Sequence, residues 1–483
     1  MTEIAYFSAR RLASMIRRGK IGCLELLDHY LDRVDRHNPA LNAIIVTDIP
    51  AARDRARAAD RALAKGEVWG PFHGLPMTVK ESFDIAGLPT TWGSPAHERN
   101  IATSDALAVT RWRDAGAVIF GKTNVPIWLA DAQSVNEIYG RTNNPWNTDL
   151  SPGGSSGGAS AALAAGLTGI EMGTDIASSL RNPAHMCGVY SLKPTYGICP
   201  PHGMALDGTL TPLDISVIGP LARSAADLEP ALRVMAGPDA IDAAGVRLVL
   251  PAPAKRVLAD FKVAVILDHS TAPVAREVGD RIAALADFLG QEGAEIVEGA
   301  RPDIDMDEAQ RTFDIMLRAA TSAVLSDEEF RAGLAHLDVG DPDADDKRAR
   351  GLKGVTLTHR EWLGFDEVRT RMRWRWHDFF QDYDLLLCPP FCTAAFAHDE
   401  RPTYAREYLV GNKAYPFMNQ TFWSGYTGLP GLPAATAPIG FTDEGLPVGV
   451  QIVGPHYGDR TCIRFAQLLE RAYQGFVAPP GYA

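Results

Sequence analysis

The sequence lacks any run of strongly apolar residues long enough to cross a membrane, and it has no surplus of basic residues. A membrane-spanning helix needs about 20 consecutive apolar residues, and the opening stretch MTEIAYFSARRLASMIRRGK has no apolar core of a secretory signal. The 483 residues include 47 Lys and Arg against 59 Asp and Glu, a formal net charge of -12. Because binding to nucleic-acid phosphates needs a basic face, we expect neither a membrane protein nor a nucleic-acid-binding protein.

Cysteine is also scarce, and its spacing excludes a disulfide framework. Six cysteines are scattered over the chain, which favours a reduced, cytoplasmic protein. Only Cys388 and Cys392 lie close together, and no neighbouring His completes a zinc-binding spacing. Asp341, Asp343 and Asp345 alternate as in a calcium loop, but the Gly and the Glu required at its sixth and twelfth positions are missing. We therefore expect no metal and no cofactor.

What the chain does contain is an alternation of amphipathic helices and short apolar strands. SARRLASMIRRG, CLELLDHYLDRVDRHNP and AARDRARAADRALAKG show helical periodicity, and the second is predicted to end before Pro39. LAVTRWRDAGAVIFGKTN indicates a helix followed by a strand, and FKVAVILD, DYDLLLCPP and PVGVQIVGP indicate further buried strands. A charged, mainly helical region is expected over residues 305–380. This order of elements predicts an α/β fold.

Two short motifs match known catalytic patterns in their letters alone. Residues 116–123, GAVIFGKT, fit the phosphate-binding pattern GxxxxGK[ST], but the interior is an apolar strand where phosphate binding needs a loop. Residues 153–157, GGSSG, fit G-x-S-x-G, but the polar, turn-rich GRTNNPWNTDLSP precedes them where a nucleophile elbow needs a strand. We expect neither a nucleotide site nor an α/β-hydrolase triad.

Three separated segments point instead to one catalytic site: LPMTVKESFD at residues 75–84, SPGGSSGGASAA at 151–162 and GTDIASSLRNPAHMCGVYSLKPT at 173–195. Together with GAVIFGKTN, GRTNNPWN, VIGPLARSAADL and GLPAATAPIGFTDEGLPVGVQIVGP, in that order, they resemble the amidase signature family of serine hydrolases. The resemblance covers roughly residues 5–475 and is weakest across 250–385. It implies a single amidase domain over 1–483, with a twisted mixed β-sheet covered by helices on both faces.

The same resemblance divides this domain into parts. We expect an N-terminal helical segment at residues 1–65 and a signature core at 66–250. A mainly helical substrate-side region should follow at 305–380, and the C-terminal part of the core at 381–475.

The resemblance also implies the catalytic roles. Ser179, two residues before Arg181, is the nucleophile; Ser155, which the family holds on a cis peptide bond, is the bridging serine; Lys80 is the base. An ordinary lysine has a pKa near ~10.4, so Lys80 can accept a proton near neutral pH only where burial lowers that pKa. The proton would pass from Ser179 through Ser155 to Lys80 and return to the leaving amine.

The residues before the nucleophile depart from the family pattern, which usually has two glycines there. This chain has Ala177 and Ser178, and a non-glycine residue at positive φ adds roughly 1 kcal/mol of strain. Ser178 stays an alternative nucleophile, although the S-x-R register favours Ser179. The oxyanion hole is expected from the backbone N–H groups of Ile176, Ala177, Ser178 and Ser179. Three further residues are expected to support the loops: Ser156, Asp175 and Arg181.

The expected activity is hydrolysis of C–N bonds in small to medium amides through an acyl-enzyme, with amide, carbamate (urethane) and ester substrates all open. Apolar residues in segments that line the family's acyl cleft predict an apolar pocket, although an aromatic residue taken singly more often packs in the core. They are Trp128, Tyr139, Phe313, Met316, Phe391, Phe422 and Trp423. We expect a monomer or homodimer. Two alternatives stay open: the glutaminase subunit of a tRNA-dependent amidotransferase, and a non-catalytic binding scaffold.

Overall fold

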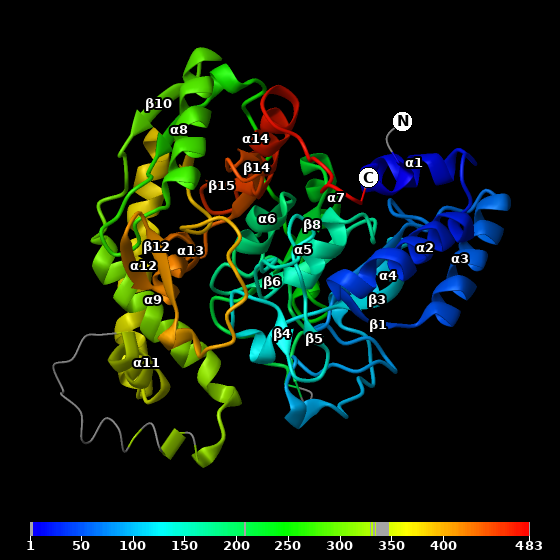
Figure 1. Cartoon of the computed structure of the whole chain (residues 1–483), viewed down its shortest axis with the longest axis horizontal. Coiled ribbons are helices and arrows are strands. Elements are labelled where there is room, and N and C mark those ends of the chain that lie inside the picture. The colour runs from blue at the N-terminus through cyan, green and yellow to red at the C-terminus, as the bar shows by residue number, and fades with distance from the viewer. Residues whose placement is uncertain (1–2, 207–208, 329, 332–333, 335–346, 483) are drawn as a thin grey trace.

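The fold is organised around an eight-stranded mixed sheet (Figure 1) in a computed structural model that describes residues 3–206, 209–328, 330–331, 334 and 347–482. The two neighbour pairs at one edge, β10–β9 and β9–β11, are parallel, and the remaining pairs are antiparallel. In spatial order the strands are β10 (Glu295–Glu298), β9 (Lys262–Val265), β11 (Leu385–Cys388), β15 (Pro447–Val453), β14 (Ala434–Phe441), β7 (Tyr190–Lys193), β8 (Val217–Ala222) and β6 (Glu171–Asp175).

A second sheet of three strands lies beside β6. Its order is β1 (Ile44–Thr47), β3 (Val118–Thr123) and β2 (Pro76–Lys80), with β2 parallel to β3 and β1 antiparallel to it. The Thr78 hydroxyl on β2 donates a hydrogen bond to the Glu171 carboxyl on β6. The two sheets therefore meet along β2 and β6. Two hairpins complete the strands: β4 (Val135–Asn136) with β5 (Gly140–Arg141), and β12 (Glu407–Val410) with β13 (Lys413–Pro416).

Helices cover both faces of the large sheet, as the alternation along β15 shows. Val448, Val450 and Ile452 join the main apolar core under α7 (Ala225–Met235), α8 (Arg276–Gln291) and α14 (Asp459–Ala472). On the opposite face, the Gly449 N–H donates to Nδ1 of His185, 2.8 Å away, and the Thr427 hydroxyl donates to Gln451. His185 lies on α6 (Arg181–Cys187), which packs with α5 (Gly157–Ala164), and Thr427 lies on α13 (Phe422–Gly428). This confirms the predicted α/β fold.

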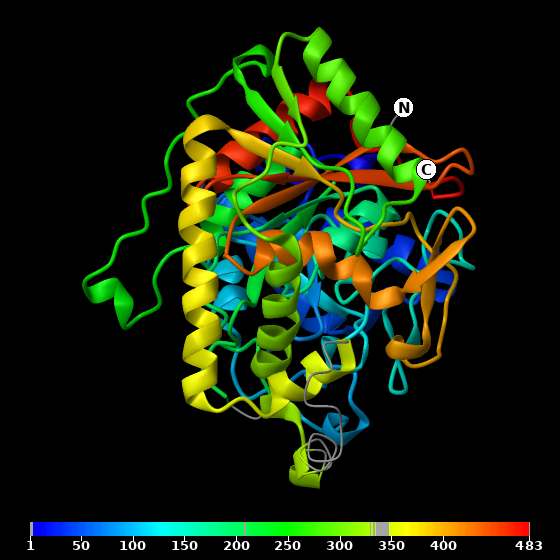
Figure 2. The same ribbon diagram turned by 90° about the vertical axis from the view of Figure 1, so that its left-hand side faces the viewer.

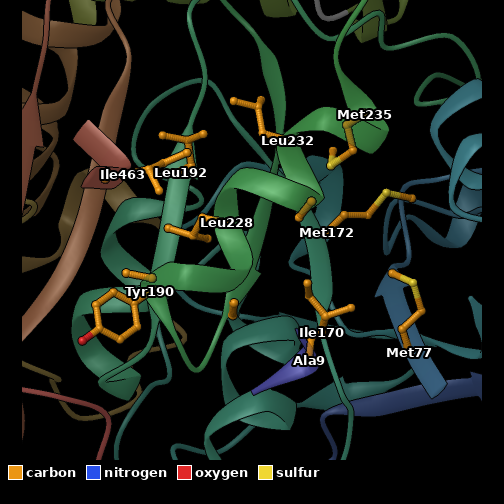
Figure 3. Close-up of a cluster of buried hydrophobic side chains, with 14 of the residues drawn as sticks. Ala9, Met77, Ile170, Met172, Tyr190, Leu192, Leu228, Leu232, Met235 and Ile463 are labelled. Carbon is orange, nitrogen blue, oxygen red and sulfur yellow. The ribbon is translucent and has the colours of Figure 1, made fainter. Parts of the chain in front are cut away.

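Figure 3 shows part of the apolar core between α7 and the strands. Leu228, Leu232 and Met235 on α7 are buried in the same cluster as Tyr190 and Leu192 on β7. Burying an apolar side chain of this size contributes about 1.5–3 kcal/mol. Met77 on β2, Met172 on β6 and Ile463 on α14 also belong to this cluster, so it joins both sheets.

The N-terminal helices are α1 (Ala9–Arg17), α2 (Cys23–Leu41), α3 (Ile49–Ala64) and, further along, α4 (Leu107–Asp114). The prediction that the second helix ends before Pro39 is wrong, because α2 continues to Leu41 and is ended by Asn42 in the left-handed conformation. Pro39 is exposed and lies in the last turn, so the backbone hydrogen bond that the proline removes is one near the end of the helix.

The mainly helical region is also present, with α9 (Met306–Thr321), α11 (Lys347–Val355) and α12 (His359–Asp382). Figure 2 shows α12 as a long yellow helix. The acidic run of Asp341, Asp343 and Asp345 lies outside the described residues. Within those described, no helix combines the length and apolarity needed to span a bilayer. All six cysteines are buried free thiols.

Candidate active site

Lys80 is the last residue of β2 and lies where the two sheets meet. Its side chain has no exposed surface. Nζ lies 2.7 Å from the Ser155 hydroxyl and 2.7 Å from the Thr174 hydroxyl. Thr174 is on β6 and Ser155 precedes α5, so three elements that are remote in sequence converge on one amine.

Burial lowers the pKa of Lys80 to about 7, although the negative charges of Asp175 and Glu81 raise it in part. Desolvation disfavours the ammonium form, and neither carboxylate contacts the amine closely enough to restore it. A large fraction of Lys80 is therefore neutral near pH 7, and a neutral amine can accept a proton.

The loop that carries Ser155 is held by close packing around its glycines. The Gly154–Ser155 peptide is cis, as the resemblance implied. A side chain at Gly154 would collide with the backbone oxygens of Gln133 and Asp131, so the loop lies against the 131–133 segment. Ser156 then bonds the backbone of Thr174, donating to its carbonyl at 3.3 Å and accepting from its N–H at 3.4 Å.

The turn from Ile176 to Leu180 connects β6 to α6 and contains both serines considered as nucleophile. The buried Asp175 carboxylate organises it, because it accepts from the N–H groups of Ser178 and Leu180, each at 3.0 Å. Burial alone would raise the pKa of Asp175, but the Arg181 guanidinium, 2.7 Å away, outweighs burial and the pKa is lowered. The carboxylate thus stays charged and holds the turn.

Arg181 connects this turn to α13 and to β15. The guanidinium is fully buried and donates to the carbonyl of Ser424 at 2.9 Å and to Oε1 of Gln451 at 2.7 Å. These partners lie on α13 and β15. A buried, bidentate Arg–carboxylate pair with its remaining donors satisfied is rigid, so Arg181 and Asp175 occupy positions suited to support.

Ser178 has φ of 103°, in the region that favours glycine. Its hydroxyl donates to the carbonyl of Pro390 at 3.3 Å. Its N–H is directed to Asp175, which corrects the expectation that all four N–H groups of residues 176–179 point to an acyl oxygen. Among the described residues, the N–H groups of Ala177 and Ser179 donate to no protein acceptor. The candidate oxyanion donors are thereby reduced to Ile176, Ala177 and Ser179.

Ser179 is buried with a small exposed surface of 7%. Its carbonyl accepts a hydrogen bond from the N–H of Ser156 at 3.2 Å, which ties the turn to the serine loop. In the described part of the chain, no hydrogen bond joins the Ser179 hydroxyl to Ser155. The structure thus brings Lys80 and Ser155 into direct contact and ties Ser179 to Ser156, the residue after Ser155, by a backbone hydrogen bond.

Two residues at the site were missed by sequence reasoning. Thr174 contacts Lys80, and the Asn182 side chain binds the backbone of Gly154 and Ser178. Both lie inside the segment 173–195 that pointed to the site. Their place in that segment was the available signal, because both prove to be buried polar residues and buried polar groups are generally hydrogen-bonded.

The predicted pocket residues divide into two groups. Trp128 and Tyr139 are partly exposed, and burial raises the pKa of Tyr139 to about 12. The others have no exposed surface and pack in the core: Phe313, Met316, Phe391, Phe422 and Trp423. For these five residues the core-packing alternative therefore describes the structure. Ile176 and Ala177 are partly buried against the cluster that contains Phe313 and Trp423, so an apolar cluster lies directly behind the turn from Ile176 to Leu180.

Comparison with known proteins gives concordant results. A sequence profile of the amidase family matches residues 25–463. The chain is 33% identical to indoleacetamide hydrolase of Bradyrhizobium diazoefficiens over 96% of this chain and 86% of that protein. It is 32% identical to a glutamyl-tRNA(Gln) amidotransferase subunit of Roseiflexus castenholzii over 98% and 96%, respectively. The crystal structure of a bacterial aryl acylamidase of the amidase signature enzymes matches with a TM-score of 0.81 at 24% identity, over 97% and 96%. This last likeness concerns the fold alone.

Proposed function

Because the chain belongs to the amidase family of amide-cleaving hydrolases, we propose that Ser179 attacks the carbonyl carbon of a small amide, with Ser155 as proton relay and Lys80 as base. The observation that carries this proposal is the 2.7 Å hydrogen bond between Ser155 and a fully buried Lys80 whose pKa is about 7. A neutral amine in contact with a hydroxyl is the arrangement that general-base activation of a serine requires.

In the first half of the reaction, the Ser179 oxygen forms a bond to the carbonyl carbon as its proton moves to Ser155. The Ser155 proton moves at the same time to Lys80, which becomes an ammonium. The carbonyl oxygen becomes an oxyanion, and we assign its stabilisation to the N–H groups of Ile176, Ala177 and Ser179. One such donor is worth about 3 kcal/mol in the transition state.

Collapse of the tetrahedral intermediate breaks the C–N bond. The leaving nitrogen takes a proton that returns from Lys80 through Ser155, so the amine departs neutral and the acyl group stays on Ser179. Water then attacks the acyl carbon and gives its proton to the same relay. The second collapse releases the carboxylic acid and returns the proton to Ser179.

The surroundings of the turn support an apolar acyl group. Ile176 and Ala177 present apolar side chains that stay partly exposed, and on their inner side they pack against a buried apolar cluster. Because burial of apolar area drives binding in such sites, we propose that aryl and arylalkyl amides are the preferred class. Carbamates and esters with similar acyl groups are further substrates under the same chemistry.

One specific observation favours a second candidate, a glutaminase acting with partner chains. The 32% identity to the amidotransferase subunit of Roseiflexus castenholzii extends over nearly the whole chain. Release of ammonia from glutamine, together with failure to cleave anilides, would support this alternative.

The test is a substrate panel of a p-nitroanilide, an anilide, a phenyl carbamate, a phenyl ester and glutamine, assayed on the wild type, Ser179→Ala and Ser178→Ala. We expect anilide hydrolysis to vanish in Ser179→Ala and to stay within about tenfold of the wild type in Ser178→Ala. Mass spectrometry after fluorophosphonate labelling should find the adduct on Ser179. An adduct on Ser178, or full activity of Ser179→Ala, would contradict the proposal.

A further inference from the structure

The Asn182 side chain bridges the two loops that carry the reacting serines. It is the second residue of α6 and is 1% exposed. Its Oδ1 accepts from the Gly154 N–H at 3.0 Å, and its Nδ2 donates to the Gly154 carbonyl at 2.6 Å. Nδ2 also donates to the Ser178 carbonyl at 3.1 Å. One amide thus binds the residue before Ser155 and the residue before Ser179.

Gly154 lies between the Asn182 amide on one side and the backbone of residues 131–133 on the other. A Cβ at Gly154 would collide with the oxygens of Gln133 and Asp131, and a Cβ at Gly153 would lie 2.5 Å from Oδ1 of Asn182. The loop is therefore confined between the 131–133 backbone and the Asn182 side chain. Both polar backbone groups of Gly154 are saturated by the same side chain, which defines the position of the following residue.

We propose that Asn182 is a positioning residue that sets the place of Ser155 relative to Ser179 and so keeps the relay aligned. This inference rests on the proposed roles of Ser179, Ser155 and Lys80. Only an amide of this length has the acceptor for the Gly154 N–H together with donors for two carbonyls. A misplacement of about 1 Å in a proton relay can cost on the order of 10²-fold in rate, whereas substrate contacts would be unaffected.

Asn182→Ala and Asn182→Asp test the inference with the p-nitroanilide as substrate. For Asn182→Ala we expect kcat to fall by on the order of 10²-fold, with KM within about threefold of the wild type. In Asn182→Asp the near-isosteric carboxylate cannot donate to either carbonyl, so kcat should fall similarly. Its new negative charge near the relay should also raise the pKa of Lys80 and move the acid limb of kcat/KM upward by about one pH unit.

Asn38→Ala is the matched control. Asn38 is half-buried, and its amide also makes three backbone hydrogen bonds, to Ile44 O, Ala43 N and Ile44 N, at the end of α2. The loss of three such bonds should lower the free energy of unfolding comparably, while kcat stays within about threefold. Lys80→Ala and Ser179→Ala in the same assay separate the two proposals, because full activity in these variants would refute the proposed function itself.

The inference is overturned if both Asn182 variants keep kcat within about threefold while Lys80→Ala and Ser179→Ala abolish activity. It is also overturned if Asn38→Ala loses as much kcat as Asn182→Ala. Failure of both Asn182 variants to fold, where Asn38→Ala folds, would identify the amide as a folding determinant and would equally contradict a positioning role.

Discussion

Lys80 and Lys193 are two buried lysines with similar acidity and different partners. Lys80 ends β2 and Lys193 ends β7, and neither is more than 1% exposed. Burial lowers the pKa of each to about 7. The Lys80 amine contacts the hydroxyls of Ser155 and Thr174. The Lys193 amine instead donates to the carbonyl oxygens of Leu432 at 2.7 Å and Pro194 at 3.1 Å.

The difference shows that a lowered pKa does not by itself make a base. A hydroxyl can give a proton to a neutral amine and receive one back, but a carbonyl oxygen has no proton to give. Lys193 also lies near Arg181, whose charge lowers its pKa further. Both lysines are buried, but of the two only Lys80 contacts a group that can donate a proton.

The largest difference in kcat/KM is expected between two variants that each remove one of these amines. Lys80→Met should lower kcat/KM for the p-nitroanilide by about 10⁴-fold, the upper end for general-base catalysis. Lys193→Met leaves two carbonyls without a donor, so it should cost about 1–3 kcal/mol of stability, while kcat/KM stays within about tenfold at a temperature where it is folded. Steady-state kinetics and thermal unfolding of both variants measure this. Equal losses of kcat/KM in Lys80→Met and Lys193→Met would contradict the different roles assigned to the two lysines.

A smaller loss of kcat/KM is expected when the hydrogen-bond partner Ser155 is removed and Lys80 is kept. In Ser155→Ala, Lys80 stays buried beside Thr174 and its pKa stays low, but the relay from Ser179 is broken. We expect kcat/KM to fall by about 10³-fold. Ser160→Ala is the control, because Ser160 is buried on α5 and its hydroxyl has no hydrogen-bond partner in the described part of the chain. Near-normal activity of Ser155→Ala would mean that contact with Ser155 is not what distinguishes Lys80.

The smallest effect is expected at Ser178, which precedes Ser179 and whose hydroxyl, like the Lys193 amine, donates to a backbone carbonyl oxygen. Ser178→Gly removes the strain of φ 103°, whereas Ser178→Ala keeps it, and both lose the bond to Pro390. Ser178→Gly should thus be more stable than Ser178→Ala by about 1 kcal/mol. Both should keep kcat within about tenfold. Denaturant unfolding measures the difference, and the opposite order of stability would contradict the assigned backbone strain.

Much of this site was predictable, because its reacting residues lie in three short segments with strong local patterns. The segments LPMTVKESFD and SPGGSSGGASAA were singled out from the sequence for Lys80 and Ser155, and the structure brings these two side chains into contact. The strand nature of GAVIFGKT was also predictable, and β3 confirms it. These features are determined by residues that are close in sequence, so local sequence patterns can predict them.

Other features depend on contacts between distant residues and were not predictable. The Ser178 N–H turns toward Asp175 because the turn folds back on itself, which residue types alone do not indicate. Phe391 is buried in a cluster with Met186 of α6, and Trp423, itself on α13, is buried in a cluster with Phe313 of α9. The residue type of an aromatic side chain is compatible with a pocket wall or with a core, and only tertiary packing decides.

The most direct test of the central claim is the pH dependence of kcat/KM for the p-nitroanilide in the wild type and in Lys193→Met. Lys80 must be neutral to accept the proton, so activity should rise about tenfold per pH unit below 7 and level off above its pKa of about 7. The limb should stay in place in Lys193→Met, which assigns it to Lys80. An acid limb near pH 10, or a limb near 7 that disappears in Lys193→Met, would contradict the account.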